Sequence, residues 1–551
     1  MTPPGSEGDG SPWWRSGVLY QVYPRSFADS DGDGTGDLPG IIDHLDYLRW
    51  LGVDGVWLSP VTASPNADWG YDVADYLVVD PDLGTSEDVD RLVAEAGRRG
   101  IRVVMDLVPN HTSDRHPWFL DARSSTTARH RQWYVWADPK PDGSPPNNWV
   151  SSFGGPAWTL DPVTGQYYLH NHLREQPDLN WWNEEVVEEF DRVMTHWFGR
   201  GIAGFRIDVC NMIVKDALLR DNPTATDADP FDVQLLGQRP VYNGNRPEVH
   251  DVIRRWRALA DRFPGRVLMG ETPVEAAGDL AAYYGRGDDE LHLAFNFPFI
   301  SAPLEAGAMR SIVEDVERHL PPGAWPAWIG SNHDMSRLAT RWAEGDRAKA
   351  KVAVVMLLGL RGTPVLYQGD EIGLADVEVP RERLRDPLGV AYWPAYAGRD
   401  AMRTPMPWRN IPGGGFTEAG VEPWLPLGDA AACNVEDQRE DPASILSLTR
   451  DLIALRRSRP DLATGPYRSL EASPGTWAWA RGDRIVVVVN LTDGDGVVDG
   501  VSGTVLLGSD RGRDGDAVDG AVRLSGWEAV VVARGTRSDG EDPVEAAGQV
   551  T

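Results

Sequence analysis

Cysteine is almost absent from this 551-residue chain, which contains only Cys210 and Cys433. Two cysteines so far apart in sequence provide no disulfide framework and no cysteine-based metal site. We therefore expect reduced thiols and a cytoplasmic location. Long apolar runs are also missing, because the longest one, residues 352–358, is far shorter than the roughly 20 residues that a membrane helix needs.

Basic residues are too few to balance the acidic ones, with 53 against 83 and a net charge of −30. A surface of this sign repels phosphate backbones and anionic lipids, which argues against nucleic acid and membrane partners. The N-terminus lacks the basic start and apolar stretch of a secretory signal. We interpret residues 1–12 and 536–551, which are polar, as disordered tails.

Strand and helix patterns alternate along most of the chain. Residues 38–51 have apolar residues at helical spacing, and a capping box at Thr85 and Asp88 predicts the start of another helix. Strand candidates begin near Val18, Gly55, Arg102, Gly204, Arg266, Leu293, Ala327 and Thr363. Such alternation is typical of a parallel sheet with crossover helices, so we predict an α/β fold, a (β/α)8 TIM barrel of residues 13–110 and 184–460.

Three segments depart from this alternation. Residues 111–183, rich in Pro, Asn, Ser and Trp, form too long a connection for a loop and predict a small inserted domain after the third strand. Residues 374–441 are loop-like and are interpreted as a lid over the barrel mouth. Residues 461–535 contain short β runs, which predict an all-β C-terminal domain.

The segment Gly204-Phe205-Arg206-Ile207-Asp208 places an arginine and an aspartate two residues apart at the end of a predicted strand. Alternation puts Arg206 and Asp208 on one face of that strand. A structural ion pair is one explanation. However, Glu271 and Asp334 follow two other strand candidates in the same way, and the active sites of TIM barrels lie where strands end. Three carboxylates at three strand ends predict one active site.

These segments resemble the α-amylase superfamily of glycoside hydrolases, in particular its α-glucosidase and oligo-1,6-glucosidase branch. The resemblance also includes Asp106-Leu107-Val108-Pro109-Asn110-His111, Gln176-Pro177-Asp178-Leu179-Asn180 and Arg403-Thr404-Pro405-Met406-Pro407-Trp408, and extends from about residue 17 to about residue 534. It implies hydrolysis of an α-glucoside with retention of configuration. Asp208 would be the nucleophile, Glu271 the acid and then the base, and Asp334 the carboxylate that stabilises the transition state.

The resemblance also implies which residues bind the sugar: Tyr71, Asp72, His111, Phe153, Arg206, Val209, His333 and Arg403. Asp72 and Arg403 would bind the terminal sugar and close the pocket, so that glucose leaves from the non-reducing end. Asp72 alternatively caps a turn. We expect Arg206 to keep Asp208 ionised, Glu271 to be protonated near neutral pH, and Asp106 to orient its neighbours.

Val209 is relevant to which glycosidic bond the enzyme cleaves, α-1,4 or α-1,6. In this branch of the family, a valine after the nucleophile tends to accompany cleavage of α-1,6 bonds. This implies that isomaltose is accepted, with maltose as a second substrate. A valine that only packs the barrel is the alternative.

Acidic residues alternate with glycines between Asp29 and Asp37, which offers hard oxygen ligands suited to Ca²⁺ or Mg²⁺. An EF-hand would need an acidic residue where Gly40 stands. The resemblance implies instead a structural metal held by Asp29, Asp31, Asp33 and Asp37 with the main chain near Thr35, and no cofactor for catalysis. A solvated acidic turn is the alternative.

Three other functions use the same fold: a transglucosylase, a sucrose isomerase and a trehalose-forming enzyme, all with the same carboxylates. A non-catalytic transporter subunit is a more distant alternative, since such relatives carry a membrane helix and tend to lack the carboxylates. We expect a short oligosaccharide or disaccharide as the substrate. The sequence does not indicate an oligomeric state.

Overall fold

The computed structural model describes residues 11–229 and 231–535, so most of the two predicted tails lies outside the described residues. Eight parallel strands form one sheet in the order β11-β10-β9-β5-β2-β1-β13-β12. A parallel bridge between Phe295 and Ala327 joins its two ends and closes the barrel. This confirms the predicted TIM barrel. The strands are β1 (Leu19–Val22), β2 (Gly55–Leu58), β5 (Arg102–Leu107), β9 (Gly204–Ile207), β10 (Val267–Gly270), β11 (Leu293–Ala294), β12 (Ala327–Ile329) and β13 (Thr363–Tyr367).

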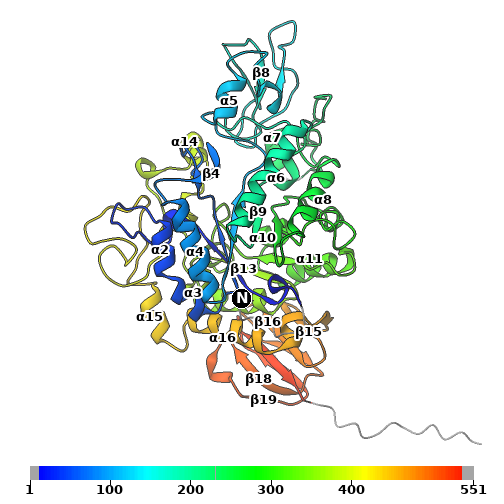
Figure 1. Cartoon of the computed structure of the whole chain (residues 1–551). Helices are drawn as coiled ribbons and strands as arrows, with labels where there is room; N and C mark the ends of the chain where they lie inside the picture. Colours follow the sequence, from blue (N-terminus) through cyan, green and yellow to red (C-terminus); the bar gives the residue numbers. More distant parts are fainter. Residues whose placement is uncertain (1–10, 230, 536–551) are drawn as a thin grey trace, which may run out of the picture.

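Helices surround the barrel (Figure 1). They include α2 (Leu38–Asp43), α3 (Leu45–Leu51), α4 (Ser86–Arg98), α6 (Glu184–Gly199), α8 (Val249–Ala260), α11 (Ala306–His319), α13 (Arg347–Gly359) and α16 (Ile445–Ser458). In α4 the predicted capping box is formed, and Val89, Leu92 and Ala96 are buried. The helix expected over residues 38–51 is divided at His44, whose ring lies 2.8 Å from the Gly40 carbonyl and competes with the helical hydrogen bonds there.

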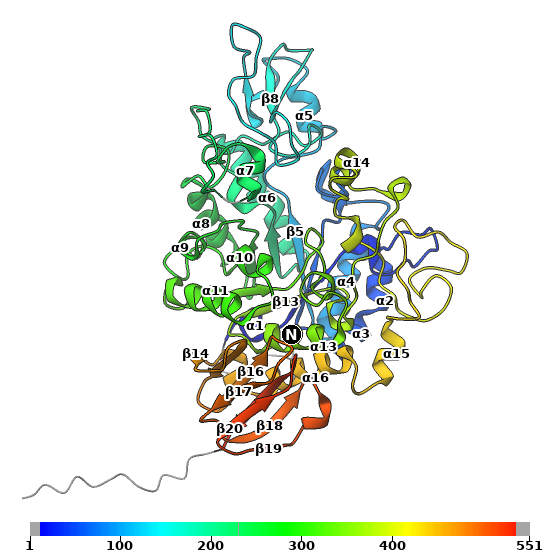
Figure 2. The same ribbon diagram turned by 180° about the vertical axis from the view of Figure 1, so that it is seen from behind.

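The C-terminal domain is all-β, as predicted, and lies under the amino-terminal ends of the barrel strands (Figures 1 and 2). Its main sheet is antiparallel and contains β14 (Tyr467–Leu470), β15 (Thr476–Arg481), β16 (Ile485–Asn490), β21 (Ala529–Arg534), β18 (Gly503–Gly508) and β19 (Ala517–Val518). Side chains of β16 alternate between two cores. Val487 and Val489 belong to the main core, which includes α13, whereas Val486 and Val488 pack in a second core with β17 (Gly496–Asp499) and β20 (Ala521–Leu524).

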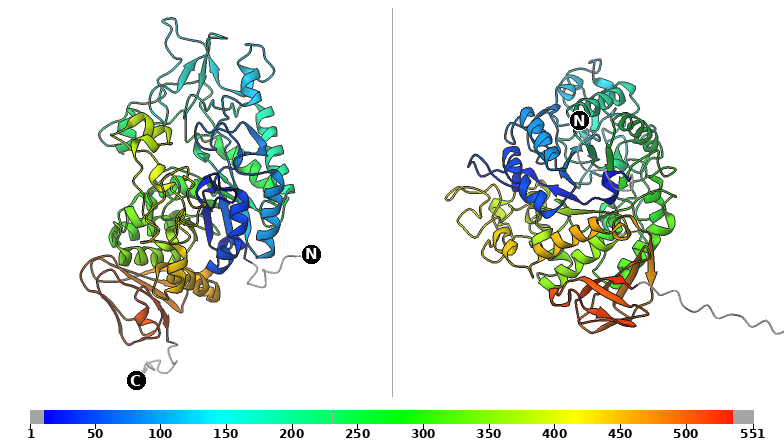
Figure 3. Two further views of the ribbon diagram at one scale, coloured as in Figure 1. Left: turned by 90° about the vertical axis from the view of Figure 1, so that its left-hand side faces the viewer. Right: turned by 60° about the horizontal axis from the view of Figure 1, so that its bottom comes forward.

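Residues 111–183 protrude from the opposite end of the barrel (Figures 1 and 3). They contain α5 (Pro117–Ala122) and a small antiparallel sheet of β6 (Trp136–Ala137), β8 (Tyr167–Leu169) and β7 (Trp158–Leu160). We call this part domain B. Residues 374–441, the segment interpreted as a lid, contain only short elements such as α14 (Pro387–Tyr392) and α15 (Val435–Glu440). In the described ranges, no helix combines the length and apolar character needed to cross a membrane.

Two buried arginines join the barrel to the C-terminal domain. Arg456 of α16 and Arg481 of β15 are 1% and 0% exposed. Both donate to carbonyl groups at the end of α13, where the last residues of a helix leave C=O groups unpaired. The Arg456 guanidinium bonds to the carbonyls of Leu358, Leu360, Gly362 and Ala463. The Arg481 guanidinium bonds to those of Gly359, Leu360 and Gly465. Burial lowers the pKa of Arg456 to about 10, so the group remains charged at neutral pH.

We predict that Arg456→Met lowers stability by about 3 kcal/mol, because it leaves several buried carbonyls without their charged donor. The melting temperature should fall by several degrees. Arg457→Met is the matched control, since that neighbouring side chain is 57% exposed and its ion pair with Asp54 should contribute about 1 kcal/mol or less. Equal melting temperatures for the two variants would contradict this role of Arg456.

Candidate active site

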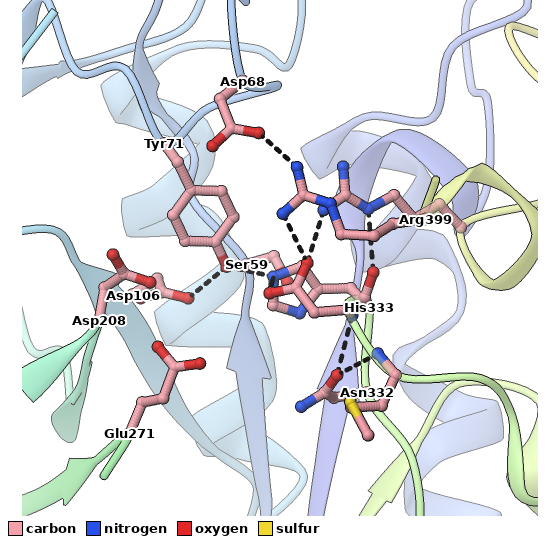
Figure 4. A network of polar contacts seen from close by, with 12 residues as sticks. Ser59, Asp68, Tyr71, Asp106, Asp208, Glu271, Asn332, His333 and Arg399 are labelled. Atoms are coloured by element: carbon pink, nitrogen blue, oxygen red, sulfur yellow. Dashed lines mark hydrogen bonds and ion pairs between the residues drawn. The ribbon is translucent and has the colours of Figure 1, made fainter. Parts of the chain in front are cut away.

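Three strand ends bring three carboxylates together at the domain B end of the barrel. Asp208 directly follows β9, Glu271 directly follows β10, and Asp334 lies in the loop after β12. Because Ile207 and Gly270 are paired in register, the first two carboxylates emerge side by side (Figure 4). Asp208 and Glu271 are 6% and 9% exposed, whereas the Asp334 side chain is 30% exposed. The structure thus brings the predicted catalytic residues into one site.

Arg206 is the cation at the centre of this site, and it is completely buried. Its Nη1 lies 2.8 Å from Asp208 and 2.9 Å from Asp106, and its Nη2 lies 2.7 Å from Glu271. The Trp57 ring packs at 5.1 Å from the guanidinium carbon. One guanidinium therefore serves three carboxylates. Arg206 was predicted to bind the sugar, but its nitrogens are directed at these acids instead.

Burial and the neighbouring acids oppose the effect of Arg206 on the pKa of Asp208. Burial raises the pKa of Asp106 to about 7 and raises that of Asp208 well above its ordinary value, although Arg206 opposes both shifts. The negative charge of Glu271 contributes further to each increase. Arg206 favours the ionised form of Asp208, as predicted, but burial and the neighbouring acids outweigh its effect on the pKa. Asp106 and Asp208 contact the same guanidinium nitrogen, so the charge of either one affects the pKa of the other.

Glu271 is held by one of its two oxygens. The Val209 amide donates to Oε2 at 2.8 Å, and Arg206 Nη2 lies 2.7 Å from the same atom. Val209 is half-buried and adopts a φ of +34°, which is rare for a β-branched residue. This backbone conformation directs the amide at Glu271. The Val209 amide and the Arg206 guanidinium thus both lie at Oε2.

Asp334 has a different environment from the other two acids. Arg403 donates to its Oδ1 at 2.6 Å and Arg399 at 3.1 Å. Burial alone would raise the pKa of Asp334, but its charged neighbours reverse this effect and hold the pKa below its ordinary value. The adjacent His333 is fully buried, which lowers its pKa to about 3 and leaves the ring neutral. Asp334 is thus a permanent anion at the pocket.

Tyr71 and His333 form a wall of the site. Their rings stack in parallel with centroids 5.3 Å apart, and the Tyr71 hydroxyl donates to Asp106 (Figure 4). Nε2 of His333 lies 2.5 Å from the Tyr71 hydroxyl, and Nδ1 lies 2.8 Å from the Gln21 amide. Tyr71 was predicted to bind substrate directly. The structure shows that its hydroxyl is engaged with protein groups, so Tyr71 contributes its ring face and orients Asp106.

The aspartate that lies beside Arg399 and Asp334 is Asp68, and not the predicted Asp72. Asp72 is completely buried, and its oxygens accept hydrogen bonds from the Ser64 hydroxyl and from the amides of Ala67 and Asp68. It fixes the loop before Tyr71, as the capping alternative holds. Burial raises its pKa to about 6. Asp68 instead lies at the pocket, 2.8 Å from Arg399 (Figure 4). Its position depends on the positive φ of Trp69, which spacing alone does not reveal.

Two arginines contact Asp334, the predicted Arg403 and Arg399. Arg403 is completely buried and donates to the His333 carbonyl as well as to Asp334, so it positions Asp334. Arg399, one helical turn earlier, joins Asp68, Asp334 and Asp386. Its guanidinium lies 5.3 Å from the centre of the Phe153 ring. Arg399 therefore joins Arg403 at Asp334, and Phe153 of domain B lies beside Arg399.

His111 also lies in this region, with the neighbour His172, which sequence reasoning missed. Nε2 of His111 is 3.0 Å from the Tyr71 carbonyl. Nδ1 of His172 is buried without a hydrogen-bond partner, and the two ring centres are 4.9 Å apart. These histidines and Asp178 have spacing suited to a metal ion, but the Lys215 ammonium already pairs with Asp178 at 2.9 Å. Both ring nitrogens of His111 contact protein groups, namely the side chains of Asn110 and Gln176 and the Tyr71 carbonyl, whereas Nδ1 of His172 does not.

The acidic loop between β1 and α2 forms a compact cluster. One oxygen each from Asp29, Asp31 and Asp37 lies within 4.8 Å of the others. Asp33 is not in this group, and its carboxylate accepts the Thr35 amide at 2.7 Å. Burial and the neighbouring carboxylates raise the pKa of Asp31. The geometry fits a hard cation with three of the four predicted aspartates, whereas Asp33 and Thr35 form a turn.

The barrel, its strand-end acids and its buried arginine define an enzyme of the glycoside hydrolase class. The chain belongs to the α-amylase family and its α-glucosidase branch, because the family model for the α-amylase catalytic domain matches residues 21–465 and related proteins carry glucosidase names. A protein named "Probable alpha-glucosidase" of Rhizobium meliloti (strain 1021) is 43% identical over 500 residues, which cover 87% of this chain and 90% of that protein.

Two further relatives show the range of this branch. An oligo-1,6-glucosidase of Heyndrickxia coagulans is 37% identical over 522 residues, which cover 87% of this chain and 92% of that protein. The solved structure of the α-glucosyl transfer enzyme XgtA is 40% identical, with a TM-score of 0.89 over 95% of this chain and 100% of that one. Hydrolases and a transferase thus share this architecture.

The assignment of the substrate carboxylate to Asp68 in place of Asp72 can be tested. Asp68→Asn should lower kcat/KM on a disaccharide by about 10- to 100-fold, mainly through KM, because a charged hydrogen bond is worth about 1.5–3 kcal/mol. Asp72→Asn is the control and should lower the melting temperature more than it alters KM. A larger change in KM for Asp72→Asn at unchanged melting temperature would restore the original assignment.

Because Arg206 contacts both Asp106 and Asp208, we predict that a substitution of Asp106 alters the pH dependence of activity. Activity requires an ionised Asp208. Activity is therefore present above the pKa of Asp208 and is lost as the pH falls through that pKa. Asp106→Asn removes a negative neighbour and should lower the pKa of Asp208, which shifts the acid limb of kcat/KM to lower pH while kcat falls. Asp72→Asn should leave the limb in place. An acid limb that stays or moves to higher pH in Asp106→Asn would exclude this coupling.

Proposed function

We propose that the protein is a retaining, exo-acting α-glucosidase that releases glucose from the non-reducing end of short α-glucosides. The observation that carries this proposal is the arrangement of Asp208 and Glu271 on one buried guanidinium, with Asp334 opposite them. A pair of carboxylates, one attacking and one donating a proton, is the chemical requirement for retaining hydrolysis.

In the first step, a carboxylate oxygen of Asp208 attacks the anomeric carbon while the bond to the leaving sugar breaks. Glu271 donates its proton to the leaving oxygen from Oε1, since Oε2 is held by Val209 and Arg206. In the second step, Glu271 takes a proton from water, the water oxygen attacks the anomeric carbon, and Asp208 is released. Two inversions give net retention.

Asp334, Asp68 and Arg399 are proposed to hold the terminal glucose. Asp334 stays ionised, so its oxygens accept hydroxyl hydrogen bonds at every stage and stabilise positive charge on the ring. The pair of Asp68 and Arg399 bounds the pocket on the lid side. The Tyr392 hydroxyl of α14 donates to the Phe153 carbonyl at 2.7 Å, so the lid also meets domain B. These contacts support a closed pocket and exo action.

Glucosyl transfer is the second candidate function. It has the same first step and replaces water by a sugar or alcohol in the second. The name of the structurally similar α-glucosyl transfer enzyme favours it. The proposed substrates remain small oligosaccharides or disaccharides, in the cytoplasm. Val209, whose amide donates to Glu271, supports our proposal on the glycosidic linkage. We propose that the enzyme hydrolyses isomaltose as well as maltose.

The test is incubation with maltose, isomaltose, sucrose and trehalose, with product identification. Hydrolysis predicts glucose from isomaltose, and transfer predicts new oligosaccharides. Asp208→Asn and Glu271→Gln should each lose on the order of 10³-fold in turnover while staying folded. More than a tenth of the turnover in either variant would contradict the assigned roles. Hydrolysis of maltose with no action on isomaltose would contradict the linkage only.

A structural Ca²⁺ or Mg²⁺ is proposed at Asp29, Asp31 and Asp37. A bound cation would relieve repulsion among these carboxylates, so a chelator should lower the melting temperature with little change in turnover at low temperature. Asp31→Asn, which removes one ligand charge, should reduce the difference between chelator and excess metal. Identical melting temperatures of the wild type in chelator and in excess Ca²⁺ or Mg²⁺ would contradict the site.

A further inference from the structure

An open cleft of about 370 Å³ lies where domain B meets the start of α6 and the loop after β9. Its volume is within the range of small-molecule sites. The described residues that line it are Thr126, Arg131, Gln132, Tyr134, Val135, Trp136, Gln166, Asn180, Trp182, Lys215, Asp216, Ala217 and Leu219. This set contains none of the catalytic acids and none of the groups assigned to the glucose pocket. We call it the Trp182 cleft.

Trp182 is unusual among the large aromatic residues of the described chain, because 52% of its surface is exposed. Its ring is nevertheless fixed in orientation. The indole Nε1–H donates to the Lys215 carbonyl at 2.8 Å, and the Trp182 amide donates to the Asn180 side chain. An exposed aromatic face with restricted rotation is a preorganised platform, since little conformational freedom is lost when a ligand stacks on it.

The cationic groups of the cleft are already engaged. The Arg131 guanidinium lies 3.4 Å from the centre of the Trp136 ring and donates to the Ala122 carbonyl. The Lys215 ammonium is 3% exposed and pairs with Asp178. An anionic ligand would therefore find its charge poorly matched, and the net charge of −30 adds long-range repulsion. A neutral ligand suits this cleft better.

The other polar groups of the cleft are the hydroxyls of Thr126 and Tyr134, the Asp216 carboxylate, which pairs with Arg220, and three side-chain amides. Gln132 is exposed, and Gln166 and Asn180 are half-buried. Gln166 already bonds to Arg131 and Asp138, and Asn180 to the Gln132 carbonyl and the Trp182 amide. The exposed Gln132 amide is thus the group that can donate to and accept from the hydroxyl groups of a sugar. A pyranose ring combines a flat face of C–H groups with such hydroxyls at its edge. An exposed indole bordered by amides is complementary to both parts.

We propose that the Trp182 cleft is a second carbohydrate site, which binds a neutral gluco-oligosaccharide away from the catalytic pocket. The choice of a glucose-based ligand rests on the proposed function, whereas the cleft itself does not. Such a site would raise the local concentration of longer substrates, as a tethered second site does. Disaccharide hydrolysis should not need it.

The test uses the full chain with ¹⁵N-labelled tryptophan in the Asp208→Asn background, which prevents turnover. The Trp182 indole resonance is assigned by its loss in Trp182→Phe. Addition of maltotriose should shift this resonance in a saturable way, and Leu218→Ala should leave the shift intact. Leu218 is the matched control, because it is 75% exposed and next to the cleft without lining it. If the Trp182 indole resonance does not shift at maltotriose concentrations that saturate the active site, the proposal is overturned.

Kinetics in the otherwise unchanged enzyme give a second measurement. Trp182→Ala should leave kcat/KM for p-nitrophenyl α-glucoside within about twofold of the wild type, as expected of a surface change. It should raise KM for maltoheptaose several-fold, and Trp182→Phe, which keeps a ring face, should raise it less. Equal effects on both substrates would overturn the proposal. An enzyme that hydrolyses neither substrate but still shows the indole shift would contradict the proposed function and leave the second site standing.

Discussion

The single guanidinium of Arg206 is the constraint on which the rest of the site depends. It is buried against three carboxylates, so the cluster has one positive charge for three acids. Removing the arginine would leave uncompensated charge in the barrel, whereas a second cation would fix every acid as an anion. With one cation, burial and the neighbouring acids still raise the pKa of Asp208 and of Asp106. The proposed roles need opposite charge states in two neighbouring carboxylates, because one must donate a proton and the other must attack as an anion.

The third acid is held by a different part of the chain. Asp334 receives its two arginines from residues 399–403, which follow the last barrel strand, β13, in sequence. Barrel strands thus position Asp208 and Glu271, the pair that we propose to react, whereas residues 399–403 pair with Asp334 and Asp68. Arg456 and Arg481 act at the other end, where they join the helix α13 to the C-terminal domain. Catalysis and stability are consequently assigned to opposite ends of the barrel.

Sequence reasoning succeeded where a physical pattern is local. The barrel strands begin within a residue or so of the predicted positions, because periodicity and helix stops are local signals, and the carboxylates at strand ends follow from strand alternation. It failed where loop conformation decides. Asp68 and Asp72 occupy one short loop, and the backbone around Trp69 determines which of them reaches the pocket. Arg399 and Arg403 differ by one turn. Spacing placed Arg206 beside Asp208, but it did not show the burial and the proximity of Asp106 that raise the pKa of Asp208.

The most direct test of the central claim is the configuration of the first product. Proton NMR of the released glucose should be recorded during the first moments of hydrolysis, before mutarotation mixes the anomers. If Asp208 and Glu271 act as nucleophile and acid on one shared arginine, the α-anomer appears first. Initial appearance of the β-anomer would show a single inversion by water and would contradict the assigned role of Asp208.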